Sequence, residues 1–253
     1  MTEAQLIEYF HLTFLQVLSS RLNQRHYVVK GGANLRYFFN SHRYSQGIDF
    51  DAVDEEPWRL ADKVDEVLEG PTITVLLRGA DAAVAQISKP KQTETTQRWK
   101  VLLAVAGRDE AISTKIEFSR RDGDQRWLLD AVPDRVVAPY ALRPPTLVHY
   151  TAAPATEQKI EALALRSETQ ARDVFDLELL FRTHPGVVEP GSLAPHTVRA
   201  AMERCLELPF GAFESQVVPF LEPELAELYG ERSSWEEMQA FVIDRLAELD
   251  EDG

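Results

Sequence analysis

Residues 28–51 read VVKGGANLRYFFNSHRYSQGIDFD, and this stretch decides the fold. It opens with two β-branched residues and a lysine, continues with Gly31 and Gly32, and then shows an amphipathic run with helical spacing. A polar turn follows, after which apolar residues alternate with Asp49 and Asp51. Because a period of two is typical of strands, the stretch predicts a strand, a glycine turn, a helix, a loop and a second strand.

Two features of this stretch indicate a site. Side chains two residues apart on a strand share a face, so Asp49 and Asp51 are expected to point the same way. Neighbouring carboxylates repel each other, and a divalent cation such as Mg²⁺ or Mn²⁺ relieves that repulsion. A glycine turn before a helix offers backbone N–H groups to a phosphate. Metal and phosphate together indicate nucleotide chemistry, while plain turn chemistry and a solvated acidic face are the alternatives.

The composition sets limits on both size and partners. With 253 residues, 44% hydrophobic and 27% charged, the chain is expected to be globular, with one large domain or two small ones. Its net charge of −14 argues against a general nucleic-acid coat protein. No acid lies between Glu8 and Asp49, where five basic residues fall: Arg21, Arg25, Lys30, Arg36 and Arg43. Such a local positive face suits a nucleotide or an RNA end, and a solvated helix surface is the alternative.

Nothing in the sequence indicates secretion or membrane insertion. The first residues, MTEAQLIEYFHL, lack the basic region of a signal peptide, and no apolar run reaches the length of a transmembrane helix. We therefore expect a cytoplasmic protein with no membrane partner. The single Cys205 excludes an intrachain disulfide and a cysteine-rich zinc site, and its helical surroundings predict a buried residue rather than a nucleophile.

The pattern of the remaining chain predicts an α+β fold in two parts. Apolar spacing predicts helices at 2–23 and 55–68 and strands near 73–77, 84–87, 99–105 and 112–118, separated at Gly79, Lys89-Pro90 and Gly107. These strands are expected to join the two central strands in an antiparallel or mixed sheet. The first part is thus a mixed sheet with helices.

The second part is expected to be a helical bundle. Residues 120–130 predict a polar hairpin or loop, and the prolines between 133 and 145 predict a passage to a mostly helical half. We therefore place a core domain at 1–145 and a helical domain at 146–253, the latter with helices near 197–208 and 234–249.

The helical half contains a second group of charged residues. Lys159, Arg166 and Asp173 are spaced seven apart, so on a continuous helix they would share a face. If the polar link SETQ breaks the helix, Asp173 lies at the start of the next one. An ion-paired helix junction without any chemistry is the alternative.

Three motifs together resemble a known family. The first is the KGG turn with the S-x-x-I-D-F strand at 45–50. The second is K-x-x-A-L-x-x-R from Lys159 to Arg166, and the third is R-D-x-x-D-L from Arg172 to Leu177. In this combination the chain resembles the polymerase-β-like nucleotidyltransferases, and among them the AbiEii/AbiGii toxin family, which includes the MenT toxins. The resemblance spans roughly residues 26–181.

The resemblance implies an enzyme that transfers a nucleoside monophosphate from an NTP to an acceptor hydroxyl with the help of Mg²⁺ or Mn²⁺. In the toxin branch the acceptor is the 3′ end of tRNA, so that translation stops, and a cognate antitoxin restrains the toxin. The family uses a third carboxylate from a neighbouring strand, a place that Glu117 of the strand STKIEFS fits; an exposed edge-strand glutamate is the alternative. The implied metal ligands are Asp49, Asp51 and Glu117.

The other implied roles concern the nucleotide. Lys30, Gly31, Gly32, Ser45, Arg166 and Arg172 are the implied nucleotide-binding residues. Lys159 is expected to neutralise charge on the β- and γ-phosphates, and Asp173 to orient that lysine or the base. Asp49, Asp51, Glu117, Lys159 and Asp173 form the implied catalytic set. The core domain would be the nucleotidyltransferase domain, to which the helical domain adds Lys159 and Asp173.

One position departs from the family pattern. The family strand usually reads S-x-D-I-D-F, with both acids catalytic, but this chain has Gly47 in place of the first acid. Either Asp51 takes over as the partner of Asp49, although it lies roughly 7 Å further along the strand, or the site holds metal weakly. A catalytically degenerate module that binds a nucleotide or a protein is therefore the alternative to an active toxin. A housekeeping enzyme that modifies a small molecule such as an aminoglycoside is a third possibility.

Overall fold

The computed structural model describes residues 1–120 and 126–250. The chain divides into two units, each with its own core. The sheet unit comprises Met1–Phe38 and Tyr44–Tyr150, and the helical unit comprises Phe39–Arg43 and Thr151–Gly253. Each unit is described by itself.

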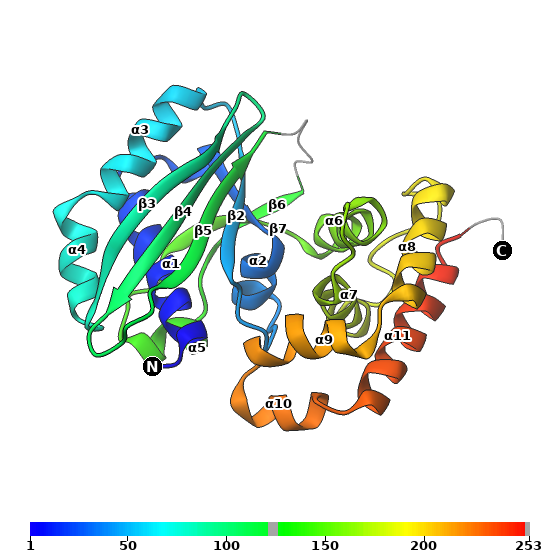
Figure 1. Ribbon diagram of the computed structural model, residues 1–253. Helices are drawn as coiled ribbons and strands as arrows, with labels where there is room; N and C mark the ends of the chain where they lie inside the picture. The colour runs from blue at the N-terminus through cyan, green and yellow to red at the C-terminus, as the bar shows by residue number, and fades with distance from the viewer. Residues whose placement is uncertain (121–125, 251–253) are drawn as a thin grey trace. The chain divides into compact units, whose positions relative to one another are not determined.

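The sheet unit is built on one mixed sheet (Figure 1). Its strands lie in the order β3-β4-β5-β2-β1-β7-β6. The pairs β1–β7 and β2–β5 are parallel and the others antiparallel, which confirms the expected mixed sheet. The strands are β1 (Tyr27–Lys30), β2 (Gly47–Ala52), β3 (Ala82–Gln92), β4 (Thr96–Val105), β5 (Ile112–Ser119), β6 (Trp127–Ala131) and β7 (Thr146–Tyr150).

Helices cover the apolar face of this sheet. Phe50 and Phe118 stack with ring centroids 4.5 Å apart, and Trp99 meets Phe118 edge-on at 6.1 Å. The apolar stripe of α1 packs against the same core. Burying these aromatic rings together with the aliphatic side chains around them is the main favourable term for the unit. Its helices are α1 (Glu3–Ser19), α2 (Gly31–Phe38), α3 (Pro57–Leu68), α4 (Pro71–Arg78) and α5 (Asp134–Val137), with short 3₁₀ turns at Gln24–His26 and Ala138–Tyr140.

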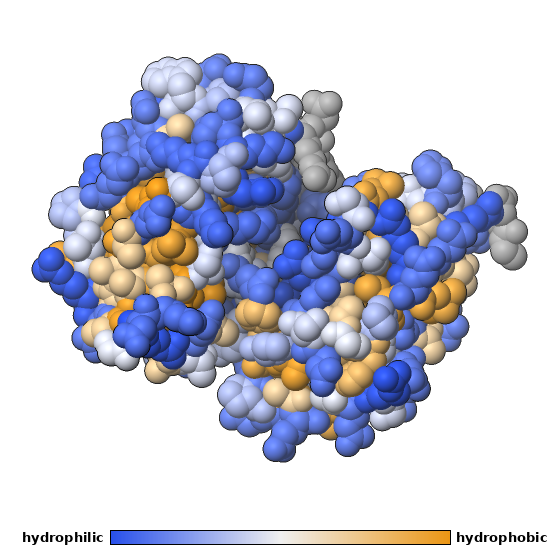
Figure 2. Space-filling view, in the orientation of Figure 1, coloured by the Kyte–Doolittle hydropathy of each residue, from blue (hydrophilic) through white to orange (hydrophobic). Residues whose placement is uncertain are grey.

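The other face of the sheet carries polar side chains near its centre. Along β2 the fully buried Ile48 and Phe50 alternate with Asp49 and Asp51, as expected from the sequence. Along β5 the buried Ile116 alternates with polar neighbours in the same way. On the visible side of this unit, Figure 2 shows apolar residues gathered over the lower part of β3 and β4 and hydrophilic residues over most of the rest.

The prediction of a strand near 73–77 is wrong, because this segment forms helix α4. Gly70 is its N-cap and Pro71 its first residue, a position where proline is favoured. Ile73 and Leu77, four residues apart, are buried, whereas Val75 is 63% exposed. Three apolar residues in alternation fit a short strand and a short helix equally well, and Pro71 at the first helical position favours the helix.

Two further predictions in this unit need correction. Lys89-Pro90 does not separate strands but lies inside β3, where the register shifts between Ser88 and Lys91. Proline is tolerated there because β3 is an edge strand. Part of the hairpin or loop predicted at 120–130 is strand β6, which pairs with β7; residues 121–125 lie outside the described part of the chain. Strand β7, which falls in the segment assigned to the second domain, pairs with β1.

The helical unit is a bundle of helices (Figure 1) with a hydrophobic core of its own. Phe213 stacks on Trp235 at 4.9 Å, and Cys205 is buried, as predicted. Among the described residues, no helix combines the length and the hydropathy that a membrane span requires. The helices are α6 (Ala152–Leu165), α7 (Ala171–Thr183), α8 (Pro195–Glu207), α9 (Phe210–Gln216), α10 (Pro223–Tyr229) and α11 (Arg232–Ala247), with a 3₁₀ turn at Val218–Phe220.

The short segment Phe39–Arg43, which joins α2 to β2 in sequence, belongs to the helical unit. Arg43 forms an isolated β-bridge with Leu221, and the ring of Phe39 meets that of His184 at 5.3 Å. The guanidinium of Arg43 also binds the buried carboxylate of Asp176. The helical unit is thus assembled from two separate stretches of the chain, which the sequence pattern did not predict.

Candidate active site

The glycine turn has the predicted strand–turn–helix form. Strand β1 ends at Lys30 and α2 begins at Gly31, whose φ of +66° lies in the region that only glycine adopts without strain. A Cβ placed on Gly31 would lie 3.3 Å from Oδ2 of Asp49. The turn therefore lies directly against this carboxylate, and the positive end of the α2 dipole favours the negative charge there.

Asp49 lies beside Glu117 in the parallel register of β2 and β5. The ammonium of Lys115 donates to Oδ1 of Asp49 at 2.7 Å and lies 3.7 Å from Oε2 of Glu117. Arg98 of β4 binds the same Glu117 oxygen at 2.5 Å. Each of these two carboxylates therefore has a protein cation beside it.

Asp51 is held more tightly than Asp49. Lys30 donates to its Oδ1 at 2.5 Å and Ser119 at 2.6 Å, while the hydroxyl of Tyr150 donates to Oδ2 at 2.9 Å. The side chain is buried, so these contacts replace the water that a carboxylate would otherwise bind. Lys30 also donates to Ser119 at 2.6 Å. The network therefore fixes Asp51 on the sheet.

Gly47 lies opposite Lys115 in the register of β2 and β5. A Cβ at this position would lie 2.5 Å from Cγ, 3.0 Å from Cε and 3.1 Å from the backbone oxygen of Lys115. The lysine side chain thus lies across the glycine on its way to Asp49. Ser45 donates its hydroxyl to the carbonyl of Gly47 at 2.7 Å, which closes the turn before β2.

The side chains around Asp49 offer few ligands for a divalent ion. Within the described residues no group of three or more His, Cys, Asp or Glu side chains is placed to hold a metal. Mg²⁺ is commonly bound by one or two carboxylates together with substrate phosphates. Asp49 and Glu117 fit one such ion by number, but the ammonium of Lys115 now lies beside both. Gly47 supplies no ligand, and the oxygens of Asp51 are engaged by three other side chains.

A second set of the predicted residues lies together in the helical unit. Lys159 of α6 lies 2.9 Å from Asp173 and 2.6 Å from Asp176, both fully buried on α7. Arg43 binds both oxygens of Asp176, at 3.0 and 2.9 Å. Burial alone raises the pKa of a carboxyl group, but Arg43 and Lys159 outweigh it and hold the pKa of Asp176 below its ordinary value.

The two predicted arginines differ in exposure. The polar link does break the helix, so that Asp173 lies in the first turn of α7. Arg166 is exposed, and its Nε lies 3.0 Å from Oδ2 of Asp173. Arg172 is half-buried, and burial lowers its pKa while Asp173 opposes that shift. Arg166 is thus the more accessible of the two to a ligand.

Several residues of these networks were missed at the sequence level. No motif points to Lys115, because its pairing with Asp49 depends on a strand register that joins segments far apart in sequence. No sequence motif points to Tyr150 or Arg98 as a site residue. Arg43 was noted only as a basic residue and Asp176 only as part of a motif, although together they anchor the segment 39–43. The R-D-x-x-D spacing is the signal that pointed to Asp176.

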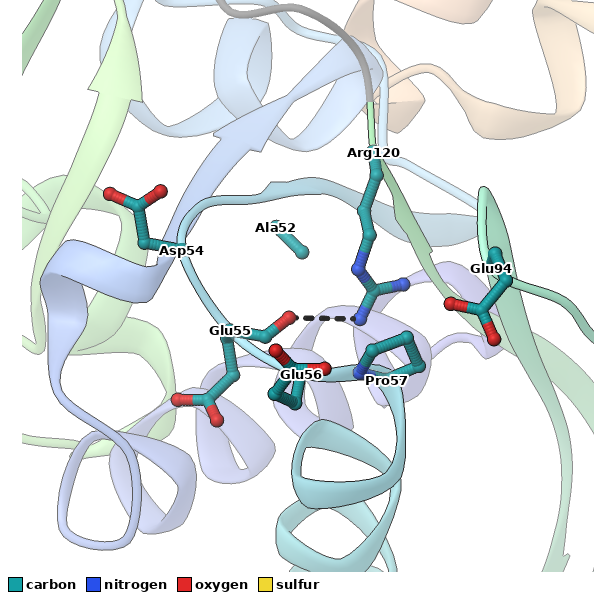
Figure 3. Close-up of a pocket in the computed structure, with 7 residues that line it drawn as sticks. All are labelled: Ala52, Asp54, Glu55, Glu56, Pro57, Glu94 and Arg120. Atoms are coloured by element: carbon teal, nitrogen blue, oxygen red, sulfur yellow. Dashed lines mark hydrogen bonds between the residues drawn. The ribbon is translucent and has the colours of Figure 1, made fainter.

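A pocket of about 340 Å³ opens in the sheet unit just beyond the end of β2 (Figure 3). Arg120 points into it and donates to the carbonyl of Glu55 at 3.4 Å. The remaining ionisable side chains are all acids, so the pocket does not suit a phosphate by charge. It is lined by Ala52, Asp54, Glu55, Glu56, Pro57, Glu94 and Arg120.

The fold and the glycine turn against Asp49 are those expected of a nucleotidyltransferase unit, and solved structures share the fold. MenT4, a nucleotidyltransferase toxin from Mycobacterium tuberculosis H37Rv, has a similar structure, with a TM-score of 0.60 and 19% identity over 99% of this chain and 86% of that one. JHP933 from Helicobacter pylori gives a TM-score of 0.54 and 16% identity over 94% of this chain and 90% of that one. A comparison with curated proteins finds no match.

A family model decides the assignment. Residues 13–248 match the family described as nucleotidyl transferase AbiEii toxin, type IV TA system. The match covers nearly the whole chain, so the chain belongs to the AbiEii family of nucleotidyltransferase toxins. The resemblance inferred from the three sequence motifs is thereby confirmed.

Proposed function

We propose that this toxin transfers a nucleoside monophosphate from an NTP to an acceptor hydroxyl, that the acceptor is the 3′ end of tRNA, and that the modification blocks translation. The observation that carries the proposal is the glycine turn at Gly31 set against the carboxylate of Asp49. This arrangement offers backbone N–H groups for a phosphate beside an acidic group that orients the reacting centre.

The sheet unit would act as the nucleotidyltransferase domain. Gly31 and Gly32 would let the backbone approach the triphosphate, with Lys30 directly before them in sequence and Ser45 in the turn before β2. Asp49 and Glu117 would hold a divalent ion, Mg²⁺ or Mn²⁺, which when bound neutralises charge on the phosphate oxygens. Asp51, with its contacts to Lys30, Ser119 and Tyr150, supports the strand that carries Asp49.

The residues of the helical unit that match the family motifs would act on the nucleotide. Lys159 carries a positive charge that suits the β- and γ-phosphates, and Asp173 fixes its position through the contact at 2.9 Å. Arg166 and Arg172 would bind the nucleotide through charge-assisted hydrogen bonds. A cognate antitoxin would restrain the toxin in the cytoplasm. Family membership supports an antitoxin partner in general and leaves its identity open.

The test is a labelling assay with the full-length protein. Purified toxin free of antitoxin is incubated with tRNA, Mg²⁺ or Mn²⁺ and each of the four α-³²P-labelled NTPs. We expect one or more NTPs to label tRNA, and Asp49→Asn or Lys159→Met to lower the rate at least about a hundredfold, as for residues in direct contact with the reacting phosphates. Lys63→Met on the surface of α3 serves as the control. Absence of label with all four NTPs would contradict the proposal.

One observation favours a second candidate function. Gly47 provides no ligand, and Lys115 lies beside both remaining carboxylates. A catalytically degenerate module that binds a nucleotide or a protein fits this arrangement. It predicts measurable NTP affinity by calorimetry without label transfer to tRNA, and label transfer to tRNA argues against it. A small-molecule acceptor would instead show as label on an aminoglycoside or similar hydroxyl compound.

A further inference from the structure

Lys115 takes a path that depends on Gly47. The two residues are register partners on the parallel strands β2 and β5, so their side-chain positions coincide on one face of the sheet. The distance of 2.5 Å from a Cβ at position 47 to Cγ of Lys115 is shorter than any real contact of this kind. Any residue larger than glycine at position 47 therefore forces this lysine side chain to leave its path.

The path ends between two carboxylates. Nζ of Lys115 lies 2.7 Å from Asp49 and 3.7 Å from Glu117, and these two acids are themselves register partners. Two adjacent carboxylates on one sheet face need a cation. In this chain the ammonium group of Lys115, on a side chain that is 39% exposed, provides that charge between the two acids, while Arg98 binds Glu117 at 2.5 Å from the neighbouring strand β4.

We propose that Lys115 is a built-in cation that takes the place of a divalent ion between Asp49 and Glu117, and that Gly47 is the residue that makes room for it. An ion that enters this site must displace the ammonium. The displacement has one consequence for catalysis: the toxin needs a higher concentration of free Mg²⁺ than the two carboxylates alone would require. Only this consequence rests on the proposed function, which the inference deepens. The competition itself is a property of the folded chain and needs no substrate.

The structure provides matched variants for a test. Lys115→Met removes the charge and keeps most of the side-chain length. Lys100→Met is the control, because Lys100 pairs with Lys115 in the β4–β5 register but forms no ion pair within the described residues. Gly47→Ala keeps the lysine and adds only the methyl group that its path excludes. Asp49→Asn combined with Lys115→Met identifies the site of binding.

The experiment measures binding of Mn²⁺ to the full-length protein by electron paramagnetic resonance titration of the free ion, without nucleotide. Removing one positive charge a few ångströms from a divalent ion is expected to tighten binding about tenfold in Lys115→Met and less than about threefold in Lys100→Met. Gly47→Ala should also tighten Mn²⁺ binding. The double variant Asp49→Asn with Lys115→Met should lose the gain in Mn²⁺ affinity that Lys115→Met alone produces.

Three results would overturn the inference: equal Mn²⁺ affinity in wild type and Lys115→Met, an equal gain in Lys100→Met, or a folded Gly47→Ala with wild-type affinity. If circular dichroism shows that Lys115→Met is unfolded, Lys115→Gln takes its place. The readout does not involve nucleotide transfer. Failure of the labelling assay with a gain in Mn²⁺ affinity refutes the proposed function alone, and labelling without such a gain refutes this inference alone.

Discussion

Gly31 and Asp49 are in near contact across the first two strands of the chain. A Cβ on the glycine would lie 3.3 Å from Oδ2 of the aspartate, and the φ of +66° at Gly31 is one that residues with a side chain adopt only with strain. The glycine is thus required twice, for its backbone conformation and for the space it leaves. These two requirements can be separated experimentally, because the chain contains a second glycine that needs the backbone conformation but not the space.

The first prediction uses that second glycine. Gly107 also has a positive φ, of +79°, but a Cβ there meets nothing within 4 Å. We expect Gly31→Ala and Gly107→Ala each to lower the free energy of unfolding by about 1 kcal/mol, since both place alanine in the left-handed region. Only Gly31→Ala is expected to reduce nucleotidyl transfer, by at least about tenfold, because it alone moves the carboxylate of Asp49. Urea titration and initial rates measure the two effects, and equal rates in both variants would contradict the role of the contact.

The second prediction concerns the support of Asp51. Tyr150→Phe removes the hydroxyl that donates to Oδ2 of this buried carboxylate at 2.9 Å. Because a hydrogen bond to a buried charge is lost, we expect the free energy of unfolding to fall by about 2 kcal/mol. Tyr229→Phe is the control, since its hydroxyl has no hydrogen bond in the described part of the chain, and a loss below about 0.5 kcal/mol is expected there. Chemical denaturation measures both, and equal losses would show that Asp51 does not depend on Tyr150.

The third prediction addresses the buried ion network of the helical unit. Asp176→Asn leaves Lys159 and Arg43 beside a neutral amide, so two buried cations lose a shared partner. We expect a loss of about 3 kcal/mol in the free energy of unfolding. Glu178→Gln, two residues along α7, breaks a pair with the half-exposed Arg182 and should cost less than about 1 kcal/mol. A small effect of Asp176→Asn in urea titration would mean that the network does not hold the unit together.

The fourth prediction concerns pH. His11 of α1 is buried, and its Nε2 contacts Thr114 Oγ1 at 2.8 Å. Because that hydroxyl donates to the carbonyl of Gln46, Nε2 of the ring donates to the hydroxyl oxygen. Burial lowers the pKa of His11 from 6.5 to about 3. Below pH 6.5 the unfolded chain therefore binds a proton that the folded chain excludes, and stability falls as the pH drops toward 3.

The expected loss at pH 5 follows from the roughly 1.5 pH units between this pH and the ordinary pKa of 6.5, because the folded-state pKa of about 3 lies lower still. This loss is about 2 kcal/mol of unfolding free energy relative to pH 7.5. His11→Gln, which keeps a donor for Thr114, should lose this component of the pH dependence, and the exposed His196→Gln should retain it. Urea titrations at pH 5 and 7.5 measure the difference. An unchanged pH dependence in His11→Gln would show that another group is responsible.

The local architecture around the glycine turn was predictable because its signals are local. A glycine pair between a β-branched run and an amphipathic run, followed by strict alternation at Ile48 and Phe50, specifies strand, turn, helix and strand without reference to the rest of the chain. The segment at 71–78 was mispredicted for the converse reason. Its apolar residues are too few to distinguish periods of 2 and 3.6, and the buried pair Ile73 and Leu77 reveals the helix only once the core is known.

The sequence motifs point to candidate site residues but not to their contacts. Asp49, Lys159 and Asp173 stand in such motifs, and their site roles stay predictions. The partners of these residues depend on long-range pairing. Lys115 reaches Asp49 because β5 runs parallel to β2 with Gly47 opposite Lys115, and no local pattern specifies that register. The same holds for Arg43, which meets Asp176 across 133 residues of sequence.

The last prediction asks whether Gly47 can be reversed to the family pattern. In Gly47→Asp alone, the new Cβ would lie 2.5 Å from Cγ of Lys115 and 3.1 Å from its backbone oxygen, so the carboxylate and the lysine cannot both keep their places. Combining Gly47→Asp with Lys115→Ala removes the side-chain conflict and restores two acids in the S-x-D-I-D-F pattern. We expect the double variant to transfer nucleotide at least about tenfold faster than either single variant at low Mg²⁺, because the two changes are coupled through one contact.

Initial rates of NTP labelling across a Mg²⁺ titration measure this double-mutant cycle, with Lys100→Ala in place of Lys115→Ala as the matched control. A coupling seen with Lys115 and absent with Lys100 ties the effect to the side chain that lies across position 47. Additive effects of the two substitutions, or a Gly47→Asp variant as fast as the double variant, would mean that Lys115 does not obstruct the added carboxylate. In that case the 2.7 Å contact between Lys115 and Asp49 only stabilises the sheet, and the glycine alone limits the site.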